Sequence, residues 1–174
     1  AGLVRLQRDD TDRLPLRGAH VPLAWAPGRF TALRAEASGG LRFDVTARAG
    51  EAALRRAAWD FYEAEARADV ARWLPQYLPG LPRAPRRIQF KALSTQWGSL
   101  APDGTMALDL SLVLGPPVAF EYVLVHELCH LIHHDHSPRY WAEVEARFPD
   151  WRDQRAWFRE EGRRLKAQRR RLVG

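Results

Sequence analysis

The sequence predicts an α+β fold in which short antiparallel strands near the N-terminus precede a largely helical second half. Apolar and polar residues alternate over 41–45, which is the period of a half-buried strand. An alanine-rich stretch over 51–74 and an almost wholly apolar stretch over 118–134 have instead the length and composition of helices. Strands that come first and helices that come later are typical of the α+β class.

The chain has the length and composition of one globular unit. Its 174 residues are 46% hydrophobic and 28% charged, which excludes an intrinsically disordered protein. We expect a β-rich segment over 1–50 and a second part over 51–174, together forming one compact unit. The single cysteine, Cys129, excludes a disulfide-stapled scaffold. No apolar run reaches about 20 residues and no signal-peptide core is present, so we expect a cytoplasmic protein without a membrane partner.

The net charge of +6 is carried mostly by arginine and is concentrated near the C-terminus. Arg163, Arg164 and Lys166 lead there into the run 169–171. Clustered arginines can bind the phosphates of a nucleic acid, which makes DNA or RNA one candidate partner of this tail. We favour the alternative, a solvated helix end whose cations suit the helix dipole.

The first predicted elements are a hairpin and a long helix. Leu41, Phe43 and Val45 alternate with polar residues, and the turn at 38–40 pairs this strand with the segment 30–37. The helix over 51–74 follows, and Pro75 is expected to end it.

A second hairpin is predicted over 86–112, with its turn at 102–104. Proline followed by Asp-Gly favours a turn, because the proline fixes one dihedral angle and the glycine accepts a positive one. The return strand continues to Leu112 and places Asp109 on its polar face.

Three helices complete the expected fold. The first spans about 118–134 and is apolar on nearly every side, which indicates a buried helix. Ser137 and Pro138 are a cap and a first helical residue for the second helix, which Pro149 ends. The last helix runs from about Asp150 into the basic tail.

The buried helix contains the motif His126-Glu127-Leu128-Cys129-His130, whose side chains are the strongest candidates for a functional site. Residues four apart share one helix face, so the two imidazoles can bind one ion, and Zn²⁺ is the metal that suits neutral imidazole. Glu127 lies about 60° around the helix from His130, where it can activate a water molecule without ligating the metal. Burial of three such groups on an apolar helix would be costly without a role for them.

A third protein ligand is expected where the chain leaves the helix, and His136 fits that position best. His134 is a weaker candidate, and Glu143 or Glu145 would give a two-histidine, one-glutamate site. His133 is about 10.5 Å along the axis from His126, too far to share one tetrahedral ion with it. Cys129 is interpreted as a small buried hydrophobic residue, and the isolated His20 as structural.

Four segments of the sequence together resemble the YgjP-like zinc metallopeptidases, which are related to the SprT-like and WLM groups. These segments are Gln96-Trp97-Gly98-Ser99, Ala107-Leu108-Asp109, the stretch 122–131, and His136-Ser137-Pro138-Arg139-Tyr140-Trp141. The resemblance implies a zincin-like helix–hairpin–helix core with a buried zinc-binding helix, His126, His130 and His136 as zinc ligands, and Glu127 as the catalytic acid/base. The sequence departs from the family pattern at Gln96, Leu100 and Asp109, none of which is a metal ligand.

The resulting hypothesis is hydrolysis of peptide bonds through a zinc-bound water that Glu127 activates. We expect a peptide or protein substrate, which can bind as an extended strand beside Trp97, Gly98 and Ser99. The oxyanion donor is Tyr140 or His134, and Asp109 is a candidate to orient a ligating imidazole. Three alternatives stay open: a zinc-stabilised module that binds DNA or protein without turnover, a protease acting on DNA-associated proteins, and a hydrolase of a non-peptide amide.

Overall fold

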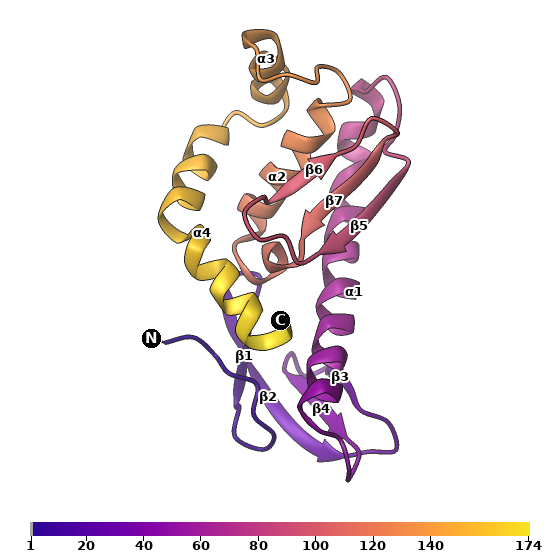
Figure 1. Cartoon of the computed structure of the whole chain (residues 1–174), viewed down its shortest axis with the longest axis vertical. Coiled ribbons are helices and arrows are strands. Elements are labelled where there is room, and N and C mark those ends of the chain that lie inside the picture. The colour runs from indigo at the N-terminus through magenta and orange to yellow at the C-terminus, as the bar shows by residue number, and fades with distance from the viewer. Residues whose placement is uncertain (1) are drawn as a thin grey trace.

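The computed structural model describes residues 2–174 and contains two small sheets and four α-helices over that range, which confirms the α+β class (Figure 1). The N-terminal sheet lies at one end of the molecule. The second sheet lies beside the helices at the other end, and a long helix connects the two regions (Figure 1).

The N-terminal sheet has the strand order β1-β2-β4-β3. Its strands are β1 (Arg13–Leu16), β2 (Ala19–Pro27), β3 (Ala32–Ala35) and β4 (Leu41–Val45). The predicted hairpin is confirmed as the antiparallel pair β3–β4. The expectation that all of these strands are antiparallel is wrong, because β4 lies between β2 and β3 and runs parallel to β2. Alternate residues of β4 are buried in the hydrophobic core.

Helix α1 (Glu51–Tyr77) is longer than predicted and continues through Pro75. The proline lies in the last turn, so the one backbone hydrogen bond it cannot form, to the carbonyl of Ala71, is lost close to the helix end. Tyr77, just beyond it, is buried and donates its hydroxyl to Glu121, so packing favours the extra turn. The short 3₁₀ helix η1 (Leu78–Gly80) follows.

The second sheet consists of β5 (Arg87–Lys91), β6 (Gly98–Leu100) and β7 (Thr105–Asp109), in the order β5-β7-β6. The predicted hairpin between the first and last of these strands is wrong, because β5 pairs with β7 in parallel. The turn at 102–104 instead joins β6 to β7, with Gly104 at φ +92°. The return strand ends at Asp109, whose carboxylate accepts the N–H of Ser111 and caps the 3₁₀ helix η2 (Leu110–Leu114).

Helices α2 (Pro117–Cys129), α3 (Pro138–Arg147) and α4 (Trp151–Val173) complete the fold. Pro117 begins α2, and Ser137 caps α3 by accepting the N–H of Tyr140, both as predicted. The expected extension of α2 to residue 134 is wrong. After Cys129 the backbone tightens, with the N–H groups of His130 and Leu131 bonded three residues back.

The basic end of α4 is packed against the protein rather than fully solvated. Lys166, Gln168 and Arg169 are all buried, whereas Arg170 and Arg171 are exposed. Gln168 bonds both backbone groups of Val4 at 2.9 Å, which connects α4 to the start of the chain. Among residues 2–174 we find no helix with the length and apolar composition needed to cross a membrane.

Candidate metal centre

Three imidazoles converge at the C-terminal end of α2. His126 and His130 share a face of this helix, and the connection to α3 brings His136 against them. One ring nitrogen from each lies within 4.8 Å of the others, and His130 Nε2 and His136 Nε2 are 3.1 Å apart. Two nitrogens that bind one tetrahedral zinc ion at 2.0–2.1 Å are about 3.3 Å apart, so His130 and His136 have the spacing for that ion and His126 lies close enough to complete the set.

Hydrogen bonds at the opposite ring nitrogens fix the orientation of two of these imidazoles. His130 Nδ1 lies 3.0 Å from the carbonyl oxygen of His133, which can only accept, so Nδ1 carries the proton and Nε2 is left as a ligand. His126 Nδ1 lies 3.2 Å from the Tyr122 hydroxyl. The Tyr140 ring stacks on His130 with centroids 4.4 Å apart. The site is therefore held by packing as well as by polar contacts.

The surroundings favour the neutral form of His126 and His130. Burial, followed by the charges of His130, His136 and Arg155, lowers the pKa of His126 to about 3. Burial also lowers the pKa of His130. A neutral imidazole has the free lone pair that a metal ion requires, so the site is prepared for a cation at ordinary pH.

Glu127 lies beside the three histidines and is 6% exposed. Its Oε2 atom is 4.0 Å from His126 Nε2, and burial raises the pKa of its carboxyl group to about 7. No described contact joins it to an arginine or lysine. A carboxyl group with a pKa near neutrality can both take up and release a proton during turnover.

Gly98 on β6 makes room for Glu127. A Cβ atom at this glycine would lie 2.9 Å from Glu127 Cγ and 3.2 Å from the carbonyl oxygen of Ala107. From the sequence, this glycine was expected to let a substrate approach, and its contact with Glu127 was not foreseen. No local signal could have revealed that contact, because it depends on β6 packing against α2.

The alternative ligands lie outside the cluster. Glu143 pairs with Arg147 at 2.8 Å, and Glu145 pairs with Arg152 at 2.9 Å. Cys129 is fully buried, which raises the pKa of its thiol to about 11.

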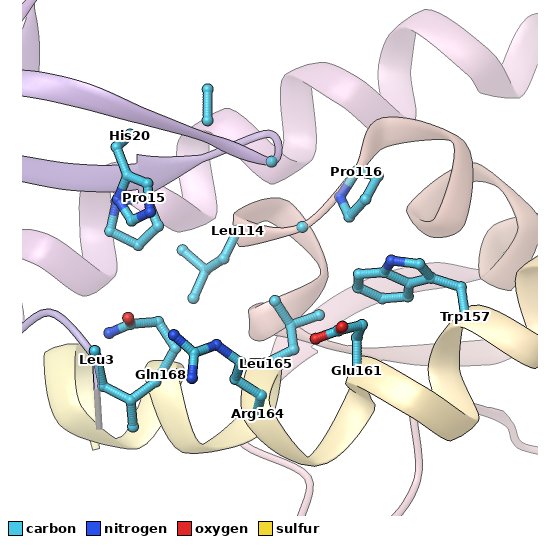
Figure 2. Close-up of a pocket in the computed structure, with 14 residues that line it drawn as sticks. Leu3, Pro15, His20, Leu114, Pro116, Trp157, Glu161, Arg164, Leu165 and Gln168 are labelled. Carbon is cyan, nitrogen blue, oxygen red and sulfur yellow. The ribbon is translucent and has the colours of Figure 1, made fainter.

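His20 lies elsewhere, at a separate cavity of about 310 Å³ between the N-terminal sheet and α4. Figure 2 shows it there on the same side as Pro15, with Trp157 of α4 across the cavity.

Asp109 takes part in a buried charge cluster rather than in a contact with an imidazole. Its carboxylate accepts the N–H of Leu93 at 2.6 Å and contacts Ser111, and it lies 3.6 Å from Lys166 Nζ. Lys166 in turn donates to the carbonyl oxygens of Leu93 and Gln96. The cluster therefore anchors the loop that leads into β6, a role that the sequence did not indicate.

Two hollows meet at Glu127. The first, which we call the ligand groove, measures about 560 Å³ and is lined by β6, the three clustered histidines and His134. The second, which we call the aromatic pocket, measures about 330 Å³ and is lined by Trp97, Tyr122, Val123 and Phe158 together with two arginines of α4. Gln96, Gly98, His126 and Glu127 border both hollows.

Comparison with known proteins identifies one family for this chain. A family model described as YgjP-like, metallopeptidase domain, matches residues 4–161. The crystal structure of the metallopeptidase zymogen of Pyrococcus abyssi abylysin is similar over 59% of this chain and 94% of that chain, with 24% sequence identity and a TM-score of 0.41. No curated protein matches the chain.

Proposed function

Because the chain belongs to the YgjP-like metallopeptidase family, we propose that it is a zinc-dependent peptidase of the HExxH type. In this proposal His126, His130 and His136 hold the ion, and Glu127 is the general base. The observation that carries it is the convergence of three imidazole nitrogens beside a buried carboxyl group. Zinc is the favoured metal because three neutral imidazoles with one open position are typical of catalytic zinc sites.

When bound, zinc polarises a carbonyl group and makes water nucleophilic at neutral pH. Glu127 takes the proton that the attacking water releases and later delivers it to the leaving amine. Its position near His126 Nε2 and its raised pKa support both transfers, since the same oxygen must accept and then donate. The close approach of Gly98 limits the positions that this carboxyl group can adopt.

Of the two candidate oxyanion donors, His134 is better placed than Tyr140. The Tyr140 ring is fully buried, and its hydroxyl donates to the carbonyl oxygen of His126 at 2.7 Å. That bond occupies the only proton the hydroxyl has to give. His134 is exposed and lines the ligand groove, so we assign the stabilisation of the oxyanion to it.

The free edge of the second sheet favours a peptide as the substrate. β6 pairs with β7 on one side only, and its residues line the ligand groove beside the histidines. An extended peptide can add to such an edge through backbone hydrogen bonds, which would place a scissile carbonyl beside the cluster. A purely structural zinc site would gain nothing from the costly burial of Glu127, so we favour hydrolysis over a binding module.

The test uses Glu127→Gln together with zinc-loaded wild type and a proteome-derived peptide library. We expect the variant to keep its zinc and to lose at least about a thousandfold in hydrolysis, because the amide cannot take up the proton. Asp153→Asn, an exposed change on α4, is the control and should cleave as wild type does. Loss of zinc from Glu127→Gln, or full activity in it, would show that Glu127 is not the base.

A further inference from the structure

The aromatic pocket contains two arginines that have no acidic partner among residues 2–174. Arg155 and Arg159 lie on α4, are exposed and line the pocket with Trp97, Tyr122 and Phe158. Neither forms an ion pair with any residue of the described range 2–174. They are four residues apart on one helix face, an arrangement in which like charges repel. An apolar pocket bordered by two unpaired guanidinium groups is suited to a ligand with an apolar body and an anionic end.

Packing holds one of these arginines in place. The Arg155 guanidinium lies 5.0 Å from the centroid of the Trp141 ring and 5.9 Å from that of Trp151. Such cation–π contacts use the face of the guanidinium and leave its N–H groups available to an anion. At the three and four residue spacings along α4, neither arginine has an acidic neighbour that could neutralise it.

The position of the pocket indicates which part of a substrate enters it. Its lining includes His126 and Glu127 but neither His130 nor His136. In the proposed function Glu127 protonates the leaving amine, so the residue that supplies this amine lies on the Glu127 side of the cluster. The pocket of about 330 Å³ has room for one side chain at that position.

We propose that the aromatic pocket selects substrates by a carboxylate on the residue after the scissile bond, held by Arg155 and Arg159. This inference rests on the proposed function and names its substrate class. The carboxylate has two chemical sources, the side chain of an acidic residue and the free C-terminus of a peptide whose last residue enters the pocket. Both present a carboxylate that planar guanidinium groups recognise through paired hydrogen bonds.

The experiment compares matched peptides on the zinc-loaded enzyme. One pair has Glu or Gln after the scissile bond and an amidated C-terminus; the other ends in Phe with a free or an amidated carboxyl group. We expect kcat/KM to be about tenfold higher for the carboxylate member of at least one pair, since charged hydrogen bonds are worth more than neutral ones. The pair that shows the preference identifies the source.

The arginines are tested through the ratio within each pair. In the double variant Arg155→Gln/Arg159→Gln this ratio should fall to within about twofold of one. Arg159→Gln alone, whose side chain has no described packing partner, should lower it part of the way. Arg163→Gln, the next arginine along the same face and outside the pocket, should leave the ratio as in wild type. A wild-type ratio near one for both pairs, or a ratio that survives the double variant, overturns the proposal.

A binding measurement separates this inference from the proposed function. Titration calorimetry of the same four peptides into zinc-loaded Glu127→Gln requires no turnover. Affinity for the carboxylate member that depends on Arg155 and Arg159 supports the inference even if wild type cleaves no peptide. Equal affinities overturn it even if wild type cleaves all four.

Discussion

Among single residues, Glu127 shows most clearly that the site lowers the stability of the fold. The carboxyl group is almost wholly buried, and burial raises its pKa from 4.5 to about 7. Between these two values the folded metal-free protein retains a proton that the unfolded chain releases. The free energy of unfolding contributed by Glu127 therefore decreases as pH rises from about 4.5 to about 7, by roughly 3 kcal/mol at most.

This cost predicts that Glu127→Gln stabilises the metal-free protein in a pH-dependent way. Urea unfolding should show a gain of roughly 1–3 kcal/mol over wild type at pH 8, where the buried carboxylate is ionised. At pH 4 the gain should nearly disappear, because Glu127 is protonated in both states. Glu160→Gln, an exposed change on α4, should alter stability by less than about 0.5 kcal/mol throughout. An equal gain at pH 4 and pH 8 would contradict this explanation.

Gly98 supports Glu127 by leaving space for it, so Gly98→Ala should impair activity. The added methyl would lie 2.9 Å from Glu127 Cγ, and either the carboxyl group or β6 must move. We expect kcat/KM on a peptide substrate to fall about tenfold or more with zinc content unchanged. Gly50→Ala is the matched control, because Gly50 has φ −97° and nothing within 4 Å of its Cβ position. Normal turnover in Gly98→Ala would show that the tight contact is unimportant.

Much of the histidine cluster could be predicted from residue spacing alone, because both spacings between its members are local. His126 and His130 are one helical turn apart, and His136 lies just before a helix cap that turns the chain back. Tyr122 and Gly98 also contact the site, but only one of these contacts could have been predicted from the sequence. Tyr122 is one turn from His126 and could have been proposed from the helix, whereas the contact of Gly98 with Glu127 depends on tertiary packing.

Among the secondary-structure elements, the second sheet shows what a sequence pattern does not predict, namely which strands pair. Alternation correctly placed Met106 and Leu108 on a buried face, but it does not identify the partner of a strand. The three-residue strand β6 is too short to have a period, so β5 was paired with β7 as a hairpin. The polar face expected for β7 is itself buried, because α4 covers Asp109 with Lys166 and Arg169.

Because Lys166 packs over Asp109 in this way, we predict that Lys166→Met destabilises the loop 92–97 as well as the fold. Lys166 donates to the Leu93 and Gln96 carbonyl oxygens, and its Nζ lies 4.4 Å from the Trp97 ring centroid. Loss of one partner of a buried charge cluster costs about 3–5 kcal/mol. Urea unfolding should show a loss of this order, and hydrogen exchange should be faster at the amides of 96–99.

Arg171→Met, which removes an exposed cation from the same helix, is the control for this prediction and should change stability by less than about 0.5 kcal/mol. If Lys166→Met is as stable as that control, the loop does not depend on the buried lysine.

At the scale of the whole molecule, α4 connects regions that are distant in sequence. It covers the Asp109 cluster, carries both arginines of the aromatic pocket and bonds the backbone of Val4 through Gln168. The sequence predicted an amphipathic helix here, but it placed the basic tail in solvent. The sequence gives the number of charged residues in a helix, but whether they are buried depends on the elements that pack against it.

In the proposed function three histidines, His126, His130 and His136, form one zinc site. Elemental analysis of protein purified without added metal tests it directly on wild type, His136→Ala and the control His133→Ala, whose side chain lies outside the cluster. We predict about one zinc ion per chain in wild type and His133→Ala, and a sharp loss in His136→Ala. Zinc retained in His136→Ala, or absent from wild type, would contradict the three-histidine site.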